Sequence, residues 1–147
     1  MSGEAIVKRG TQKTLEASGA SIVNNALAQA DDATYSLSSD GGDYPDARFV
    51  LACTFGTAPT ENTTINLYAR PLDVDGTLDT DVPETTRPTL YIGRFKVNNV
   101  TSQQVLVLYA KELPDLAEYY IHNNGTGQTI SSGWTLKVSP RSVGPAA

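Results

Sequence analysis

Apolar and polar residues alternate along most of this chain, and the alternation limits the fold more strongly than any other feature of the sequence. The pattern is clearest within residues 62–70 and 133–140. Successive side chains of a β-strand point to opposite faces of its sheet, so residues at every second position share one face. The side chains predicted to point inward in these two segments are Ile65, Leu67, Ala69, Trp134, Leu136 and Val138.

Other segments extend the same β pattern. Residues 47–55 and 103–110 are apolar on both faces, which is typical of strands central to a packed sandwich. The segment TLYIGRFKV alternates less cleanly, and we expect Tyr91, Phe95 and Val97 to share one of its faces. Turn segments rich in Gly, Pro, Asn and Asp separate about eight or nine predicted strands.

These strands and turns predict an all-β protein, an antiparallel two-sheet β-sandwich of jelly-roll type with extended terminal arms. The predicted organisation is an N-terminal arm over residues 1–15, a single sandwich domain over 16–140 and a C-terminal tail over 141–147. One alternative stays open inside the domain, because residues 21–30 would also present an apolar stripe as a helix.

The charge balance argues against several classes of function. The net charge is −5, whereas nucleic-acid binding needs clustered lysines and arginines, so no nucleic-acid partner is expected. No apolar run approaches the roughly 20 residues of a membrane span, and no signal-peptide pattern opens the chain. We therefore expect no membrane partner. Cys53 is the only cysteine, and its apolar neighbours predict a buried thiol.

The segment PLDVDGTLDTDVPE, residues 71–84, contains the DVDGT pattern that opens the active site of haloacid-dehalogenase-type phosphatases. That chemistry requires Asp73 to end a buried parallel strand that is followed by helices. Pro71 interrupts the preceding strand and no alternation of strands with helices follows, so the scaffold for phosphatase chemistry is missing. We predict that the motif carries no catalytic residues.

Calcium binding is the stronger functional alternative for this segment, because several carboxylates stand at alternate positions. The candidate ligands are Asp73, Asp75, Asp79 and Asp81. Their spacing differs from that of an EF-hand loop, in which Thr77 would stand at a ligand position, although Glu84 does fall at the last one. The favoured interpretation is a solvated acidic loop without metal, and no cofactor is predicted.

The remaining candidates for chemistry are few. His122, the only histidine, lacks the Cys or His partners of a usual zinc site, and no G-x-S-x-G nucleophile elbow occurs. We therefore predict that the chain is not an enzyme. Several aromatic side chains would suit a carbohydrate-binding platform, although packing is the favoured role for residues spaced in this way. These aromatic residues are Tyr91, Tyr109, Tyr119, Tyr120 and Trp134.

With strands and turns placed, the chain resembles small virion structural proteins of tailed bacteriophages. The resemblance is carried by residues 47–76, 91–97 and 112–140, which contain a DG turn, a G-x-F strand, an LP pair and an N-x-T-G sequence in that order. It covers roughly residues 45–140 and includes no catalytic signature.

The resemblance implies a non-enzymatic virion protein, and among these it favours a head decoration (cement) protein that binds and stabilises the outer capsid surface. Its partners would be the major capsid protein or other virion proteins. By analogy with jelly-roll decoration proteins it would also self-associate as a homotrimer. The protein would be made in the bacterial host cytoplasm and reside on the surface of the phage particle. Lys8, Arg9 and Lys13 would contact an acidic partner face. The alternative is a tail-associated, receptor-binding or carbohydrate-binding sandwich module.

Overall fold

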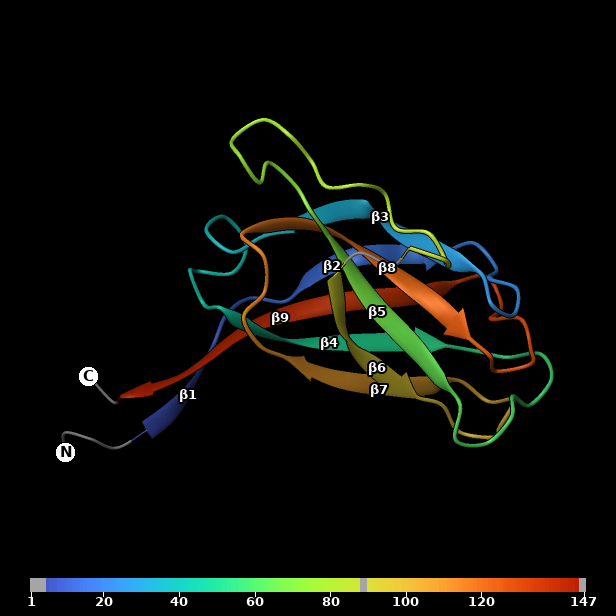
Figure 1. Cartoon of the computed structure of the whole chain (residues 1–147). Helices are drawn as coiled ribbons and strands as arrows, with labels where there is room; N and C mark the ends of the chain where they lie inside the picture. Colours follow the sequence, from blue (N-terminus) through green and yellow to red (C-terminus); the bar gives the residue numbers. More distant parts are fainter. Residues whose placement is uncertain (1–4, 88–89, 146–147) are drawn as a thin grey trace.

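The computed structural model describes residues 5–87 and 90–145 of the chain. All nine secondary-structure elements in these residues are strands, and they form two antiparallel sheets that pack face to face (Figure 1). The predicted all-β sandwich is therefore confirmed. The strands are β1 (Ala5–Arg9), β2 (Lys13–Gly19), β3 (Leu27–Ser36), β4 (Asp46–Cys53), β5 (Thr64–Pro71), β6 (Leu90–Lys96), β7 (Gln104–Ala110), β8 (Leu116–Asn124) and β9 (Trp134–Pro145).

The strand pairs are nested in sequence, and this nesting defines the jelly-roll topology. β5 pairs with β6 in the middle of the chain, and the pairs β4–β7, β3–β8 and β2–β9 lie successively outside it. Pairing of β4 with β9 and of β5 with β8 joins them into sheets. One sheet has the order β1-β9-β4-β7, with β2 also paired to β9, and the other has the order β3-β8-β5-β6. Apart from β1, the strands form two four-stranded sheets, β2-β9-β4-β7 and β3-β8-β5-β6, and this is the jelly-roll arrangement.

The long strand β9 pairs with two strands along one edge. Its first half pairs with β2, and residues 141–145 pair with β1. The two ends of the described chain therefore form a two-stranded ribbon that extends past the sandwich (Figure 1). We call this pairing of β1 with residues 141–145 the terminal ribbon. The sandwich begins before the predicted boundary at residue 16, because β2 starts at Lys13 and Leu15 is fully buried.

Burial in the core confirms the inward face predicted for the two segments that alternate most clearly. All six side chains predicted to point inward from β5 and β9 are at most 1% exposed. The two sheets meet through large side chains such as Phe49 of β4 and Tyr119 of β8, whose ring centres lie 5.0 Å apart. Each large apolar side chain buried in this way contributes roughly 1.5–3 kcal/mol to folding.

The prediction for Tyr91 is wrong. Phe95 and Val97 are buried, but Tyr91 is 51% exposed. The pairing of β6 with β5 skips Ile92, so a bulge adds one residue to β6 at this point. One extra residue sends the following side chains to the other face of the sheet. Tyr91 therefore lies on the outer face, where its ring packs edge-on against Tyr68.

Residues 21–30 do not form the helix that the sequence left open. Asn24 and Asn25 occupy a turn, and β3 follows it directly. The side-chain oxygen of Asn24 accepts a hydrogen bond from the N–H of Gly127, and that of Asn25 accepts one from the N–H of Gly125. These side chains thus hold the distant turn after β8, and asparagine favours such turns over a helix interior.

Trp134 explains why position 19 holds a glycine. The indole is almost fully buried, and its Nε1–H donates a hydrogen bond to the Ala20 carbonyl at 2.8 Å. A Cβ atom at Gly19 would lie 2.0 Å from Cε2 of the indole ring. Because this ring is packed on its other sides, no larger residue fits at position 19 without displacing it.

Gly19→Ala should therefore destabilise the protein by roughly 1–3 kcal/mol, measured as the free energy of unfolding in urea. Gly56→Ala is the matched control, because a Cβ atom at Gly56 would have no heavy atom within 4 Å. The control should be neutral or slightly stabilising, since alanine restricts the unfolded chain. Equal stability of the two variants would contradict the packing of Trp134 on Gly19.

Candidate functional site

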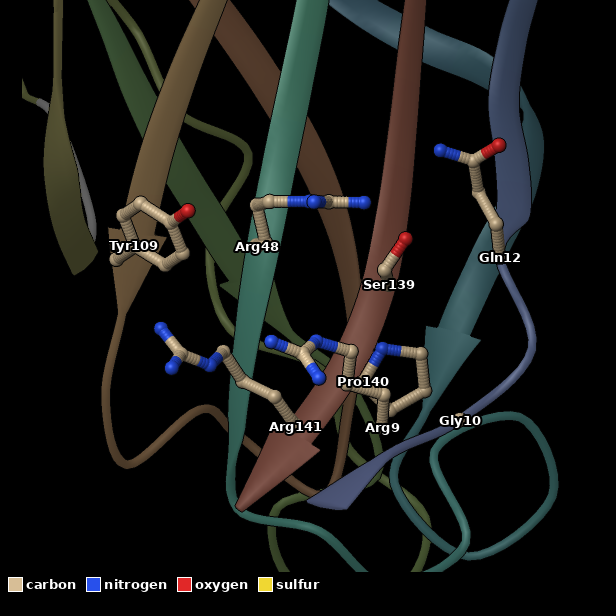
Figure 2. Close-up of a pocket in the computed structure, with 8 residues that line it drawn as sticks. All are labelled: Arg9, Gly10, Gln12, Arg48, Tyr109, Ser139, Pro140 and Arg141. Atoms are coloured by element: carbon tan, nitrogen blue, oxygen red, sulfur yellow. The ribbon is translucent and has the colours of Figure 1, made fainter. Parts of the chain in front are cut away.

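A pocket of about 270 Å³ lies on the outer face of the β1-β9-β4-β7 sheet, where the terminal ribbon leaves the sandwich (Figure 2). Strands β1, β4, β7 and β9 line it, together with the segment between β1 and β2. The polar side chains of the lining are Arg9, Gln12, Arg48, Tyr109, Ser139 and Arg141. Because three of these are arginines, we call this site the arginine pocket.

The strand register brings these side chains together. Arg48 alternates with buried residues along β4, so its side chain points away from the core. Across the sheet it lies opposite Tyr109 of β7 and Ser139 of β9. Nearer to the ribbon, Arg9 of β1 lies opposite Arg141 of β9. Four strands that are distant in sequence therefore meet at one basic site.

The three arginines make no ion pair within residues 5–87 and 90–145. The ion pairs in these ranges are Lys13–Asp40, Arg70–Glu118 and Glu84–Arg87. Like charges directly opposite each other on neighbouring strands destabilise a sheet, and Arg9 and Arg141 are in this position. In a chain of net charge −5, three arginines without an ion pair in one pocket are a distinctive arrangement.

Nearby groups only partly satisfy these guanidiniums. Asp46 lies opposite Arg141, but its Oδ1 accepts a hydrogen bond from the N–H of Glu112 at 3.0 Å and forms no ion pair. The Arg141 guanidinium instead lies 4.6 Å from the ring centre of Tyr109, a cation–π contact. The Nε–H of Arg48 is buried and has no hydrogen-bond partner in the described parts of the chain, and a buried donor left unpaired costs roughly 1–3 kcal/mol.

This arrangement is suited to binding an oxyanion. A guanidinium group donates paired hydrogen bonds to a carboxylate or a phosphate, and partial burial strengthens the attraction. The lining contains no histidine, cysteine, lysine or acid, so the pocket itself offers no general base that would activate Ser139. The chemistry available in the pocket is therefore recognition of negative charge.

The three bases predicted to contact a partner lie in different environments. Arg9 lines the arginine pocket. Lys8 is its neighbour on β1, so its side chain leaves the opposite face of the strand. Lys13 makes an ion pair with Asp40, with 2.8 Å between Nζ and Oδ2, so its charge is already paired within the chain.

The candidate calcium ligands, which the sequence analysis weighed against a loop without metal, do not gather into a three-carboxylate cluster within the part of the chain that the structure describes. The side chain of Asp75 accepts hydrogen bonds from the N–H groups of Thr77 and Leu78, which lower the pKa of Asp75. The side chain of Asp79 accepts one from the N–H of Asp73. These carboxylates therefore hold the backbone of their own loop. The four candidates were Asp73, Asp75, Asp79 and Asp81.

A different carboxylate cluster, which the sequence did not predict, lies between β2 and β3. Oxygens of Glu16, Asp31 and Asp32 lie within 4.8 Å of one another. Irregular pairing brings them together, because β2 shifts its register on both sides of Glu16 and β3 shifts between Ala30 and Tyr35. Bulges of this kind cannot be recognised from a period of two, which is why the cluster was missed.

Two members of the cluster, Glu16 and Asp32, have opposite pKa shifts. Burial of Glu16, followed by its hydrogen bond to Asp32 and the nearby negative charges, raises the pKa of Glu16 to about 7. The pKa of Asp32 is lowered, because the N–H of Ala17 donates a hydrogen bond to its carboxylate at 2.7 Å. Glu16 therefore titrates near neutral pH, where Asp32 is already charged.

The surroundings of the histidine and of the cysteine indicate structural roles for both residues. His122 lies on β8, and its Nε2 is 3.2 Å from the carbonyl oxygen of Asn25. Cys53 is buried as predicted, and burial raises the pKa of its thiol to about 11. A thiol in this environment is largely protonated at neutral pH and unreactive.

The aromatic residues considered for a carbohydrate platform do not share one surface. Tyr119 and Trp134 belong to the core, and Tyr120 is only 6% exposed. Tyr91 and Tyr109 are exposed, but they lie on different sheets. A continuous platform built from all five is therefore not present.

Asp73 does not have the setting of a phosphatase nucleophile. The preceding strand, β5, is antiparallel to both of its neighbours, β6 and β8. No helix follows Asp73 in the described part of the chain. The residue lies in an exposed loop with a φ of 51°, held by the loop contacts described above.

Comparisons with protein-family models, with curated proteins and with solved structures find no match to this chain. Among the described residues, no helix is long and apolar enough to cross a membrane. The inference of function therefore rests on the fold and on the groups that it exposes.

The raised pKa of Glu16 predicts a pH-dependent loss of stability. Below the ordinary pKa of 4.5, the protonated Glu16 makes its full contribution to the free energy of unfolding. This contribution is lost as the pH rises through about 7, because the unfolded state releases the proton more readily than the folded state. Glu16→Gln removes this loss. The variant should gain on the order of 2 kcal/mol relative to the natural protein between pH 5 and pH 8, in urea unfolding at both pH values.

The shift of Asp32 acts at lower pH, since its pKa moves downward from 3.8, so it does not mask the effect of Glu16. Asp115→Asn, a change at an exposed carboxylate outside the cluster, is the control. If the stability difference between Glu16→Gln and the natural protein is the same at both pH values, the burial of Glu16 beside Asp32 is contradicted.

Proposed function

We propose that the chain is a non-enzymatic phage virion protein of the head decoration (cement) type, which binds the outer capsid surface as a homotrimer and stabilises the shell. Its partners are the major capsid protein or other virion proteins, together with further copies of itself. The protein is made in the bacterial host cytoplasm and functions on the surface of the particle. The observation that carries the proposal is the terminal ribbon.

The terminal ribbon exposes apolar side chains on both of its faces. Ile6 and Val7 are neighbours on β1 and so leave opposite faces, and both are exposed. Val143 of β9 lies opposite Val7 and is 59% exposed. A ribbon of two strands has no second layer to cover such residues, and an isolated two-stranded unit is only marginally stable in water. A surface that covers the ribbon would bury these side chains and fix its position.

The outer face of the same sheet has the composition of a protein interface. Val105, Val107 and Tyr109 of the edge strand β7 are all exposed. The arginine pocket adjoins them through Tyr109. Exposed apolar groups next to tyrosine and arginine are characteristic of the central part of protein interfaces, where these two residue types are enriched. This face supports a role in assembly.

The fold is compatible with this role without specifying it. Jelly rolls occur in viral capsid and lectin domains and in cupins, so the topology alone does not determine function. The proposal depends on the combination of the jelly roll with an uncovered ribbon, a basic pocket whose arginines form no ion pair within residues 5–87 and 90–145, and an apolar edge strand.

Purified protein should bind capsids of its phage that lack it and should raise the temperature at which they come apart. Val7→Lys/Val143→Asp, which places opposite charges across the ribbon, should weaken binding by roughly 100-fold or more, because charges would replace an apolar pair at the contact. Co-sedimentation with capsids measures binding. Unfolding of the isolated variant should match that of the natural protein, since the ribbon lies outside the core.

Val100→Asp is the control, because Val100 is comparably exposed but lies in the loop between β6 and β7. This variant should bind capsids normally. Failure of the natural protein to bind either capsids or tails would overturn the proposed function. Normal capsid binding by the ribbon variant would show that another surface makes the contact.

One observation favours the carbohydrate-binding alternative. Tyr91 is exposed on the outer face of the β3-β8-β5-β6 sheet, and its ring lies 5.7 Å from that of Tyr68. Tyr68 is buried, so the exposed ring of Tyr91, held against it, would offer the stacking surface for a sugar ring. A glycan-array signal that is abolished by Tyr91→Ala without unfolding would support this alternative over capsid binding.

A further inference from the structure

The connection between β5 and β6 carries the carboxylates that the arginine pocket lacks. Its described residues, 72–87, contain five exposed carboxylates, and we call this segment the acidic loop. Its ion pair is Glu84–Arg87, so none of its aspartates is paired with a base among the residues that the structure describes. The aspartates are Asp73, Asp75, Asp79 and Asp81. The acidic loop extends well away from the sandwich (Figure 1).

The acidic loop is ordered by its own hydrogen bonds. Arg70 Nε–H donates to the carbonyl of Thr80, and the N–H of Thr80 donates to the carbonyl of Pro71, which fixes the base of the loop. The N–H of Val74 donates to the carbonyl of Leu78 near the tip. A segment that is already held in one conformation loses less entropy when it binds.

The loop also exposes apolar side chains between its acids. Val74, Leu78 and Val82 are each more than half exposed. The surface beside the arginine pocket combines exposed apolar side chains with positive charge. Its apolar part is Val105 and Val107, which lie on the same strand as Tyr109 of the pocket. The two surfaces therefore match in charge and in apolar character.

These surfaces lie on opposite sides of one molecule. The acidic loop joins two strands of the β3-β8-β5-β6 sheet, whereas the arginine pocket opens on the outer face of the other sheet. The packed core separates the two sheets. A contact between loop and pocket therefore requires two molecules.

We infer that the arginine pocket binds the acidic loop of a second copy of this chain through its carboxylates. Asp73 and Asp81 have the carboxylates that make no hydrogen bond within the described chain, and they are the groups offered to Arg48 and Arg141. Two different surfaces meet in this contact, so repeated contacts form a closed ring or an open chain of subunits. Closure after three copies gives the homotrimer. The inference rests on the self-association in the proposed function but not on capsid binding.

Charge reversal in the isolated full-length protein tests this contact. Sedimentation equilibrium should show association of the natural protein that weakens as salt increases. Arg48→Glu/Arg141→Glu and Asp73→Lys/Asp81→Lys should each raise the dissociation constant by at least ~tenfold. A mixture of the two variants should associate again into pairs and open or even-numbered assemblies, because each variant offers the surface that complements the other and a ring of three cannot alternate two variants. Glu61→Lys, at an exposed acid in another loop, should associate like the natural protein.

Several results would overturn the inference. A natural protein that is monomeric at every concentration would do so, as would charge-reversal variants that associate normally or a mixture that stays dissociated. If the double reversal in the pocket fails to fold, Arg48→Gln provides the same test with a smaller change. Sulfate at matched ionic strength should weaken the association more than chloride by competing for the pocket. Sulfate binding to the pocket that leaves the association unchanged would instead identify a site for free anions and overturn the inference. Capsid binding is measured separately, so failure of the ring contact and failure of the proposed function are distinguishable.

Discussion

The antiparallel pairing of β9 with β4 is the interaction on which the rest of the structure depends. The first half of β9 supplies Trp134, Leu136 and Val138 to the core, and the same strand continues past the sandwich to pair with β1. Because the register aligns Arg48 with Ser139, it also places the pocket at the point where β9 leaves the sandwich. Core, terminal ribbon and pocket therefore share one strand alignment. A slip of β9 by one residue would turn its side chains in all three regions to the opposite face of the sheet.

The sequence was sufficient for the parts of the fold that depend on local alternation. The inward residues of β5 and β9 and the all-β class were predicted because a period of two directly reports which face of a sheet is buried. Tyr91 and the cluster around Glu16 were not, because bulges in β6, β2 and β3 interrupt that period. Arg48 and Arg141 escaped notice because only long-range pairing brings them to Arg9.

The proposed function follows from features that reduce the stability of the isolated chain. Arginines opposite one another, an unpaired Nε–H on Arg48 and valines exposed on a ribbon are all unfavourable in a monomer surrounded by water. Natural sequences keep such local conflicts chiefly where function requires them. A protein surface would relieve each conflict, either an apolar one facing the ribbon or an acidic one facing the pocket. On this ground we propose that the molecule is one component of an assembly.

A density map of the intact phage particle tests this account most directly. The account predicts the nine-stranded sandwich on the outer surface of the head, with the terminal ribbon against the shell and the acidic loop of each copy in the arginine pocket of its neighbour. A particle in which the sandwich is absent from the head, or in which ribbon and pocket both face solvent, would contradict it.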